Sequence, residues 1–244
     1  MHTIAVYSSK GGVGKTATAV NLAYACAVRG HRTLLCDMDS QGAAGFYYRV
    51  HGSPKLNRTK FLKGNLDKYA CKTEVPRLDV LPSHVSFRNF DRVLDRNKNE
   101  TLKELFNGLQ KKYDVLLFDC PPNMTILSEN LIVAADQIIT PVVPTTLSIR
   151  ALVQLRKFLE KIGVPRKRHR AFFSMVERRK NMHISTIQHY GNKKVFFRTF
   201  VAYLADVEKM GIALQPVALT SPFSLSASAY DRLWMEVWKR RNHL

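Results

Sequence analysis

A glycine-rich turn between an apolar run and a stretch of small residues constrains this sequence more than any other feature. The turn, KGGVGKT, occupies residues 10–16, with the apolar run at 4–7 and the small residues at 17–28. The backbone N–H groups of such a turn converge on an anion, and the N-terminus of the following helix adds the positive end of its dipole. The segment therefore predicts a phosphate-binding loop, with the Lys15 ammonium on the β- and γ-phosphates and the Thr16 hydroxyl on Mg²⁺.

Strand and helix signals alternate along the rest of the chain. This alternation predicts an α/β fold with a doubly wound, mostly parallel sheet flanked by helices. The length of 244 residues suits one such unit, and we expect residues 1–244 to form a single domain. Residues 43–75 have weak periodicity, and we expect only a helix or two there. Strands are expected at 33–36, 78–81, 115–118, 137–143 and 171–176, and helices at 101–112, 127–135, 148–162, 204–210 and from Ser221 or Ser224 to about 240.

Three acidic residues follow predicted strands. Asp119 ends the apolar run 115–118 in the Walker B arrangement, in which the carboxylate holds Mg²⁺ opposite Thr16. Asp37 and Asp39 follow the strand at 33–36, at the edge of the sheet where ligands bind. One of these two carboxylates can organise the water shell of the metal, and the other can orient the attacking water.

Lys10 is not part of the ordinary P-loop spacing, which requires a glycine where Ser9 stands. This K-G-G-x-G-K-T form resembles the deviant Walker A box of the ParA/MinD family of dimeric ATPases. Two more boxes of the family match in order, D-x-D-x-Q-G at 37–42 and D-x-P-P at 119–122. The chain is most similar to the small, Soj-like ParA proteins, so we expect a P-loop NTPase fold of the deviant Walker A type.

The resemblance implies a nucleotide-sandwich homodimer that ATP and Mg²⁺ close and hydrolysis opens. In the family, the lysine that matches Lys10 reaches the phosphates of the partner subunit, and the aspartate that matches Asp39 positions the lytic water. A second cation also has a physical reason, because charge spreads over the phosphoryl group during transfer. Such an ATPase should be slow until a partner protein adjusts the site.

The expected site residues fall into three groups. The segments at 210–212 and 216–217 resemble the part of the family that closes over the adenine, whereas the usual Ile-Pro-Arg tract is not evident near 199–201. The expected catalytic residues are Lys10, Lys15 and Asp39; the expected nucleotide contacts are Lys10, Gly11, Gly12, Val13, Gly14, Lys15, Thr16, Ala17 and Pro216; the expected metal ligands are Thr16, Asp37 and Asp119.

The charge of the chain points to a polyanionic partner. The net charge is +19, and residues 151–200 alone carry 13 basic and two acidic residues. No helix-turn-helix or zinc pattern accompanies them, so we expect phosphate contacts to double-stranded DNA without sequence preference. The candidate DNA contacts are Arg166, Lys167, Arg178, Arg179, Lys193, Lys194, Arg198 and Arg240.

These features together suggest a ParA-type ATPase that forms an ATP-dependent dimer, binds DNA nonspecifically and is stimulated by a ParB-like or other adaptor protein. The cargo would be a plasmid, a chromosome or a protein assembly. The alternative is a MinD-like, membrane-associated positioning ATPase, whose last helix would place Trp234 and Trp238 beside the basic residues 239–241. We expect that helix to pack in the core instead, and we do not expect a membrane partner.

The cysteines and the ends of the chain bear on location. The four cysteines are widely spaced and form no C-x-x-C pair, as is typical of reduced cytosolic thiols. A redox ATPase like the nitrogenase iron protein would need a second cysteine in a glycine-rich context besides Cys120, and none is present. The first strand leaves no room for a signal peptide, and no apolar run reaches transmembrane length. We therefore expect a cytoplasmic, nucleoid-associated protein.

Overall fold

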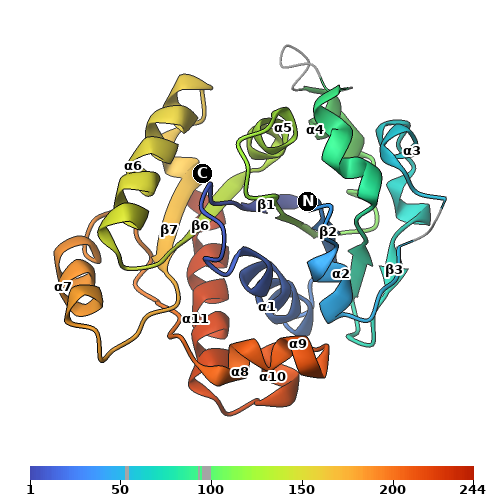
Figure 1. Cartoon of the computed structure of the whole chain (residues 1–244). Helices are drawn as coiled ribbons and strands as arrows, with labels where there is room; N and C mark the ends of the chain where they lie inside the picture. The colour runs from blue at the N-terminus through green and yellow to red at the C-terminus, as the bar shows by residue number, and fades with distance from the viewer. Residues whose placement is uncertain (53–54, 93, 95–99) are drawn as a thin grey trace.

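A mostly parallel sheet forms the centre of the molecule (Figure 1). The computed structural model describes residues 1–52, 55–92, 94 and 100–244. Within these residues seven strands pair in the order β3-β4-β2-β5-β1-β6-β7, and only the β3–β4 pair is antiparallel. The prediction of a doubly wound α/β sheet is therefore confirmed. The strands are β1 (His2–Val6), β2 (Thr33–Asp37), β3 (Cys71–Lys72), β4 (Leu78–Leu81), β5 (Val115–Asp119), β6 (Gln137–Val142) and β7 (His169–Phe173).

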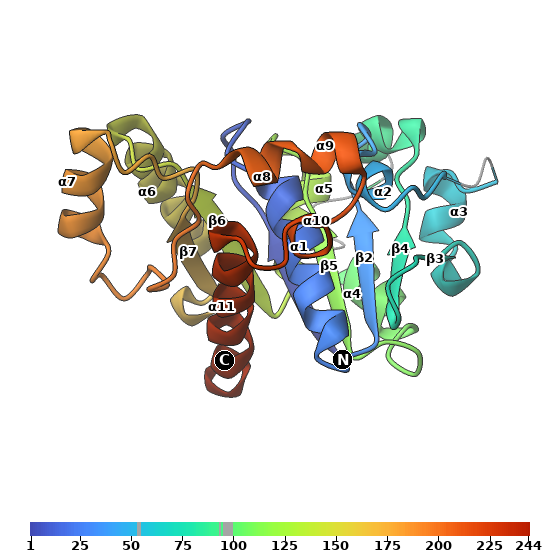
Figure 2. The ribbon, with the colours of Figure 1, turned by 90° about the horizontal axis from the view of Figure 1, so that it is seen from below.

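Helices cover both faces of this sheet, as Figure 2 shows. The three central strands are buried along their whole length apart from His2, because apolar side chains from both faces enter a core. Ile4 and Val6 face α1 and α11, and Ala5 faces α4, α5 and α6. The helices are α1 (Lys15–Val28), α2 (Ala43–Tyr47), α3 (Arg58–Leu62), α4 (Glu100–Asn107), α5 (Ile126–Ala134), α6 (Thr146–Lys161), α7 (Asn181–Tyr190), α8 (Ala205–Glu208), α9 (Met210–Ala213), α10 (Val217–Thr220) and α11 (Leu225–Arg240).

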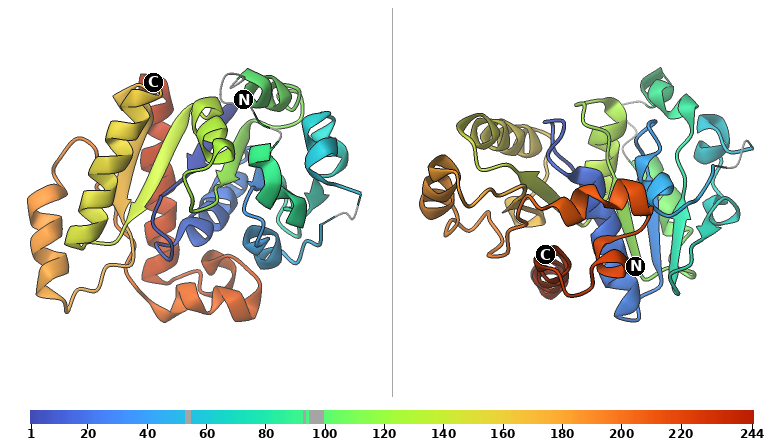
Figure 3. Two further views of the ribbon diagram at one scale, coloured as in Figure 1. Left: turned by 45° about the horizontal axis from the view of Figure 1, so that its top comes forward. Right: turned by 60° about the horizontal axis from the view of Figure 1, so that its bottom comes forward.

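The last helix, α11, packs in the core beside α1, and Figure 3 shows the two helices side by side on one face of the sheet. Ser224 caps its N-terminus by accepting a hydrogen bond from the N–H of Ala227. Leu233 and Trp234 are fully buried. From Ala229 to Val237 the apolar stripe of α11 is therefore covered by protein, as expected from the sequence. No helix in the described part of the chain is long and apolar enough to cross a membrane.

Three elements differ from the predictions for local reasons. The helix predicted over 101–112 ends at Asn107, because Gly108 and a turn follow it. β7 ends at Phe173, three residues early, since Met175 adopts a left-handed backbone with φ 54° that leaves the sheet. α7 was not predicted, because His183 is its only buried residue and its sequence therefore has no apolar stripe.

Candidate nucleotide and metal site

The glycine-rich turn connects β1 to α1 at the carboxyl edge of the sheet, as the sequence predicts. Gly12 and Gly14 have φ of 66° and 86°, values that favour a residue without a side chain. Gly14 is the N-cap of α1 and provides no side-chain cap, so the N–H groups of the first turn can bind an anion. A Cβ added to Gly11 or Gly12 would meet no heavy atom within 4 Å, so both stand beside open space. The loop has the form of a phosphate cradle.

Lys15 points into the carboxylates of the site. Its side chain is only 8% exposed, and its ammonium donates a hydrogen bond of 3.2 Å to the carbonyl oxygen of Lys10. Burial lowers the pKa of Lys15, while the charges of Asp119 and Asp39 oppose that change. Lys15 is therefore a buried cation that is bonded to a backbone carbonyl and lies in the field of two carboxylates.

Asp37 and Asp119 lie next to each other at the ends of β2 and β5, where they are paired in register. Both are buried, and one Asp37 oxygen accepts a hydrogen bond of 3.0 Å from the N–H of Gly45. The other Asp37 oxygen and both Asp119 oxygens have no hydrogen-bond partner in the described residues. Burial, with the charge of Asp39, raises the pKa of Asp37 to about 7, and burial beside Asp37 raises the pKa of Asp119 well above its ordinary value.

These oxygen atoms fit a divalent cation. Buried carboxylate oxygens without partners are costly, and a cation bound between them removes that cost. The Thr16 hydroxyl lies close to Asp119 and acts to lower its pKa, against the larger effect of burial. Carboxylate and hydroxyl oxygens, together with phosphate and water, are the ligands that Mg²⁺ takes. Thr16, Asp37 and Asp119 are thus placed to hold Mg²⁺ beside the phosphate cradle.

Asp39 lies beyond the end of β2 and is only partly buried. One of its carboxylate oxygens accepts a hydrogen bond of 3.0 Å from the N–H of Gln41, and its carbonyl oxygen accepts another from Gly42. Its charge acts on Lys15, Asp37 and Asp119, so the side chain is close to all three. This position, partly open to solvent and next to the cradle, suits a carboxylate that orients a water molecule.

Lys10 does not point outward in this single chain. Its ammonium donates a hydrogen bond of 2.9 Å to the hydroxyl of Ser148, in the first turn of α6. Ser148 is buried and also accepts a hydrogen bond from the N-cap Thr145. Sequence reasoning missed Ser148, because 138 positions separate it from Lys10 and a serine at a helix start reads as an ordinary capping residue.

The expected adenine-side residue, Pro216, is buried at the N-cap of α10. The next residue, Val217, donates its N–H to the side-chain oxygen of Asn21 on α1 at 2.9 Å. The Asn21 amide nitrogen in turn contacts the sulfur of Met210 at 3.2 Å. Asn21 therefore joins the helix of the phosphate loop to the C-terminal segment, a role the sequence did not reveal. Of the remaining candidates, Val13 is buried and Ala17 is partly buried in the first turn of α1.

The candidate DNA contacts separate into three places. Arg166, Lys167 and Arg240 lie at the amino edge of the sheet, opposite the phosphate loop, where Arg166 pairs with Glu160 at 2.7 Å. Lys193 and Lys194 follow α7, with the Lys193 ammonium 4.5 Å from the centre of the Tyr190 ring. The third place is a cavity of about 610 Å³ lined by Arg178, Arg179 and Arg198, together with Arg232, which was not predicted.

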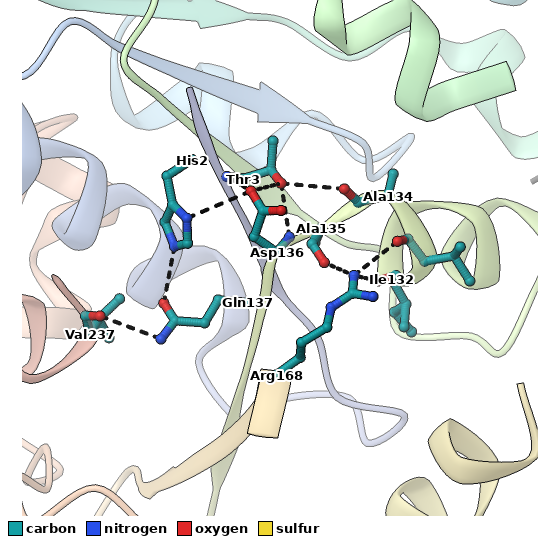
Figure 4. A network of polar contacts seen from close by, with 10 residues as sticks. His2, Thr3, Ile132, Ala134, Ala135, Asp136, Gln137, Arg168 and Val237 are labelled. Atoms are coloured by element: carbon teal, nitrogen blue, oxygen red, sulfur yellow. Dashed lines mark hydrogen bonds and ion pairs between the residues drawn. The ribbon is translucent and has the colours of Figure 1, made fainter. Parts of the chain in front are cut away.

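A polar network at the amino edge of the sheet gives the basic residue Arg168 a structural role (Figure 4). The Arg168 guanidinium donates to the carbonyl oxygens of Ile132, Val133 and Ala135 at the end of α5. Nearby, Thr3 donates its hydroxyl to Asp136 at 2.8 Å. Arg168 thus caps a helix C-terminus and closes the loop that enters β6.

Comparison with known proteins places this geometry in context. A family model described as "AAA domain" matches residues 1–170. The virulence plasmid ParA family protein pGP5-D of Chlamydia psittaci is 32% identical over 169 residues, which are 67% of this chain and 65% of that protein. The chromosome partitioning protein ParA of Caulobacter vibrioides is 31% identical over 66% of this chain and 63% of its own length. The chain thus matches less than two thirds of the length of these two relatives.

Other matches extend over nearly the whole chain. The sporulation initiation inhibitor protein Soj of Bacillus subtilis is 28% identical over 96% of this chain and 97% of its own. Among solved structures, a plasmid partition protein of Borrelia burgdorferi bound to AMPPNP gives a TM-score of 0.82 at 21% identity, over 98% of both chains. The septum site-determining protein MinD of Pyrococcus horikoshii, complexed with Mg-ADP, gives 0.80 at 20% identity over 97% of this chain and 95% of its own. At these identities, the structures indicate a shared fold.

Proposed function

Since this chain belongs to the ParA/MinD family of P-loop ATPases, we propose that it hydrolyses ATP to partition or position a cargo by binding DNA nonspecifically in an ATP-dependent dimer. The cargo would be a plasmid, a chromosome or a protein assembly. A ParB-like or other adaptor protein would stimulate a slow basal hydrolysis. The main support for this proposal is the set of unpartnered oxygens of Asp37 and Asp119 beside the phosphate cradle. They supply the cation site that a nucleoside triphosphate requires.

The residues of the site divide the chemistry between them. The N–H groups at the start of α1 and the Lys15 ammonium bind the phosphates and stabilise charge on the transferring group. Thr16, Asp37 and Asp119 would hold Mg²⁺, which would neutralise the phosphate charge when bound. Asp39 accepts a hydrogen bond from the attacking water and orients it along the line of displacement.

Dimerisation would complete the site through Lys10. In the single chain the Lys10 ammonium is bound to the hydroxyl of Ser148. Released from Ser148, it would supply the second cation on the phosphates of the facing subunit. An active site that is complete only in the dimer would link hydrolysis to assembly.

DNA binding is supported by the distribution of charge. The net charge of +19 includes arginines whose side chains form no ion pair in the described residues, among them Arg178, Arg179 and Arg198. Guanidinium groups of this kind bind phosphates by releasing counterions from the duplex, so the affinity should fall steeply with salt. In the described part of the chain, no helix shows the pattern of an element that reads bases in a DNA groove. Contacts to the DNA backbone are therefore favoured.

The experiment is retention of a duplex of arbitrary sequence by the full chain with ATP, with ADP and without nucleotide, over a series of salt concentrations. We expect retention only with ATP, lost in Lys10→Ala and kept or prolonged in Asp39→Ala. Lys63→Ala, which removes an exposed lysine at the C-cap of α3, is the control for charge alone. Retention that does not depend on the nucleotide would contradict the proposal.

A further inference from the structure

A cavity of about 610 Å³ lies between the β7–α7 loop, residues 198–204 and the first half of α11. Its lining combines arginines with apolar side chains, and a DNA site does not require the apolar ones. None of its lining residues belongs to the phosphate loop, so it is separate from the nucleotide site. Its lining comes from the segment before α7, the segment before α8 and the helix α11, and Figure 1 shows where these three helices lie. Four arginines contribute to the lining: Arg178, Arg179, Arg198 and Arg232.

These four guanidinium groups are not paired with a carboxylate in the described residues, although Glu236 accepts the backbone N–H of Arg198 at 2.9 Å. The one acid of the lining, Glu177, is already paired with Lys180 at 2.6 Å. The Arg178 guanidinium lies 5.5 Å from the centre of the Phe200 ring, which holds it over the cavity wall. The cavity therefore favours a ligand that brings at least two negative charges.

The rest of the lining is apolar. Phe200 is partly buried, whereas Leu225 is 67% exposed although the stripe it begins on α11 is otherwise buried. Tyr203 is 44% exposed at the same cavity, and Phe223, two residues before Leu225, is fully exposed. Large apolar side chains gathered in the open at one place mark a surface that binds a partner. The other apolar lining residues are Val176, Ala202, Leu204 and Ala229.

The two halves of the lining together select the occupant. A DNA duplex presents phosphates to the arginines but leaves Phe200 and Leu225 in water. A bilayer presents anionic headgroups to the rim, but its flat surface does not fill a concave cavity. A polypeptide satisfies both, because acidic side chains pair with the guanidinium groups while an aromatic or aliphatic side chain enters the apolar part.

We propose that this cavity binds an acidic polypeptide segment that carries an aromatic or aliphatic anchor side chain. The segment would belong to a partner protein and would occupy the same arginines that contact DNA. Binding of the segment and of DNA is therefore mutually exclusive, and the partner displaces DNA directly, before any hydrolysis. This second consequence rests on the proposed function, whereas binding of the segment does not.

The test measures binding of two fluorescent polymers to the full chain by anisotropy, without DNA. One polymer is poly-L-glutamate, and the other is a random copolymer of glutamate and tyrosine. We expect the copolymer to bind about tenfold more tightly, since burial of one aromatic side chain supplies that difference. Leu225→Ser should reduce its affinity to that of poly-L-glutamate. Leu219→Ser is the matched control, because Leu219 is 43% exposed and lies outside the cavity.

The outcomes separate the inference from the proposed function. Equal affinity for the two polymers, or an equal loss in Leu225→Ser and Leu219→Ser, would overturn the inference whatever DNA does. Leu225-dependent binding to phosphatidylglycerol vesicles with no preference for the copolymer would also overturn it and assign the surface to a membrane. Copolymer binding without any retention of DNA would keep the inference and reject the proposed function. Displacement of bound duplex by the copolymer, but not by equal charge of poly-L-glutamate, is the result expected when both hold.

Discussion

The Lys10 ammonium and the Ser148 hydroxyl are hydrogen-bonded at 2.9 Å, which ties the phosphate loop to the first turn of α6 within one subunit. Lys10 must break this bond before it can reach any other group. A hydrogen bond of this kind contributes about 1 kcal/mol net, and more to a charged donor. The contact therefore favours the single chain over any arrangement in which Lys10 points outward.

Ser148→Ala should shift the dimerisation of the chain with a nonhydrolysable ATP analogue to a protein concentration roughly thirtyfold lower, because two lysines are freed in the dimer at about 1 kcal/mol each. Analytical ultracentrifugation measures the shift. Ser128→Ala is the matched control: Ser128 occupies the same place after the N-cap of α5, where Thr125 accepts its N–H, but no lysine contacts it. An unchanged dimerisation constant in Ser148→Ala would mean that the hydrogen bond between Lys10 and Ser148 does not oppose dimerisation.

Asp37→Asn should change how stability depends on pH in the absence of divalent cations. The pKa of Asp37 rises from 3.8 to about 7 on folding, so between these values the folded chain holds more protons than the unfolded chain. The free energy of unfolding therefore falls as the pH rises through this window, by up to ~4 kcal/mol for a group shifted this far. The variant should lose the part of this dependence that Asp37 contributes, while buried Asp119 keeps its own, and it should be more stable than the wild type at pH 8. Denaturant titrations with a chelator present measure it.

Asp67→Asn is the control for that series. The hydrogen bond from Lys112 lowers the pKa of Asp67. Removal of the Asp67 charge should therefore change the free energy of unfolding in the opposite direction, and destabilise the chain above the ordinary pKa of an aspartate. A pH profile of Asp37→Asn that follows the wild type would refute the assignment of the buried charge.

Removal of the metal should weaken nucleotide binding only where the carboxylates are intact. With the wild type, chelation of Mg²⁺ should abolish most of the thermal stabilisation by an ATP analogue, because the phosphates lose their cation. Asp119→Asn should give the same small stabilisation with or without Mg²⁺. Asp136→Asn, at the opposite edge of the sheet, should keep the wild-type response. Differential scanning fluorimetry distinguishes the three cases.

Asn21→Ala should destabilise the chain by about 1–3 kcal/mol, since it leaves the buried N–H of Val217 without a partner. It should also weaken nucleotide binding, because the segment at 210–217 is no longer fixed to α1. Asn192→Ala, in an exposed turn, should change neither quantity. Urea titrations and calorimetric binding of ADP provide the two measurements, and a loss of stability with unchanged ADP affinity would confine Asn21 to a structural role.

Arg179→Ala should reduce the slope of log affinity for DNA against log salt by about one, as expected for the loss of one phosphate contact. Arg166→Ala should change the slope by much less, because Glu160 already neutralises that guanidinium. Equal changes in the two variants would indicate that only the summed charge matters.

Sequence reasoning predicted the sheet, the phosphate loop and the edge carboxylates because each depends on local signals. The apolar runs before Asp37 and Asp119 mark buried parallel strands, and parallel strands bring their carboxyl ends together. The register that sets Asp37 beside Asp119 follows from that topology.

Contacts that depend on tertiary packing were not predictable. Ser148 and Asn21 are polar residues with ordinary local roles until folding places Lys10 and Val217 next to them. Arg166 and Arg178 are equally basic in the sequence, but only the structure reveals that one has an acidic partner and the other lines a cavity. β3 is too short, at two residues, to leave any periodic signal.

The helix α11 also determines the distance between two basic parts of the protein surface, the cavity and Arg240. Its 16 residues extend for about 24 Å from the cavity at its first half to Arg240 at its last turn. A duplex that touched both ends would cover about seven base pairs per subunit, at about 3.4 Å for each. In the proposed DNA-bound state, a shorter duplex should reach only one end of this helix and bind with fewer released counterions.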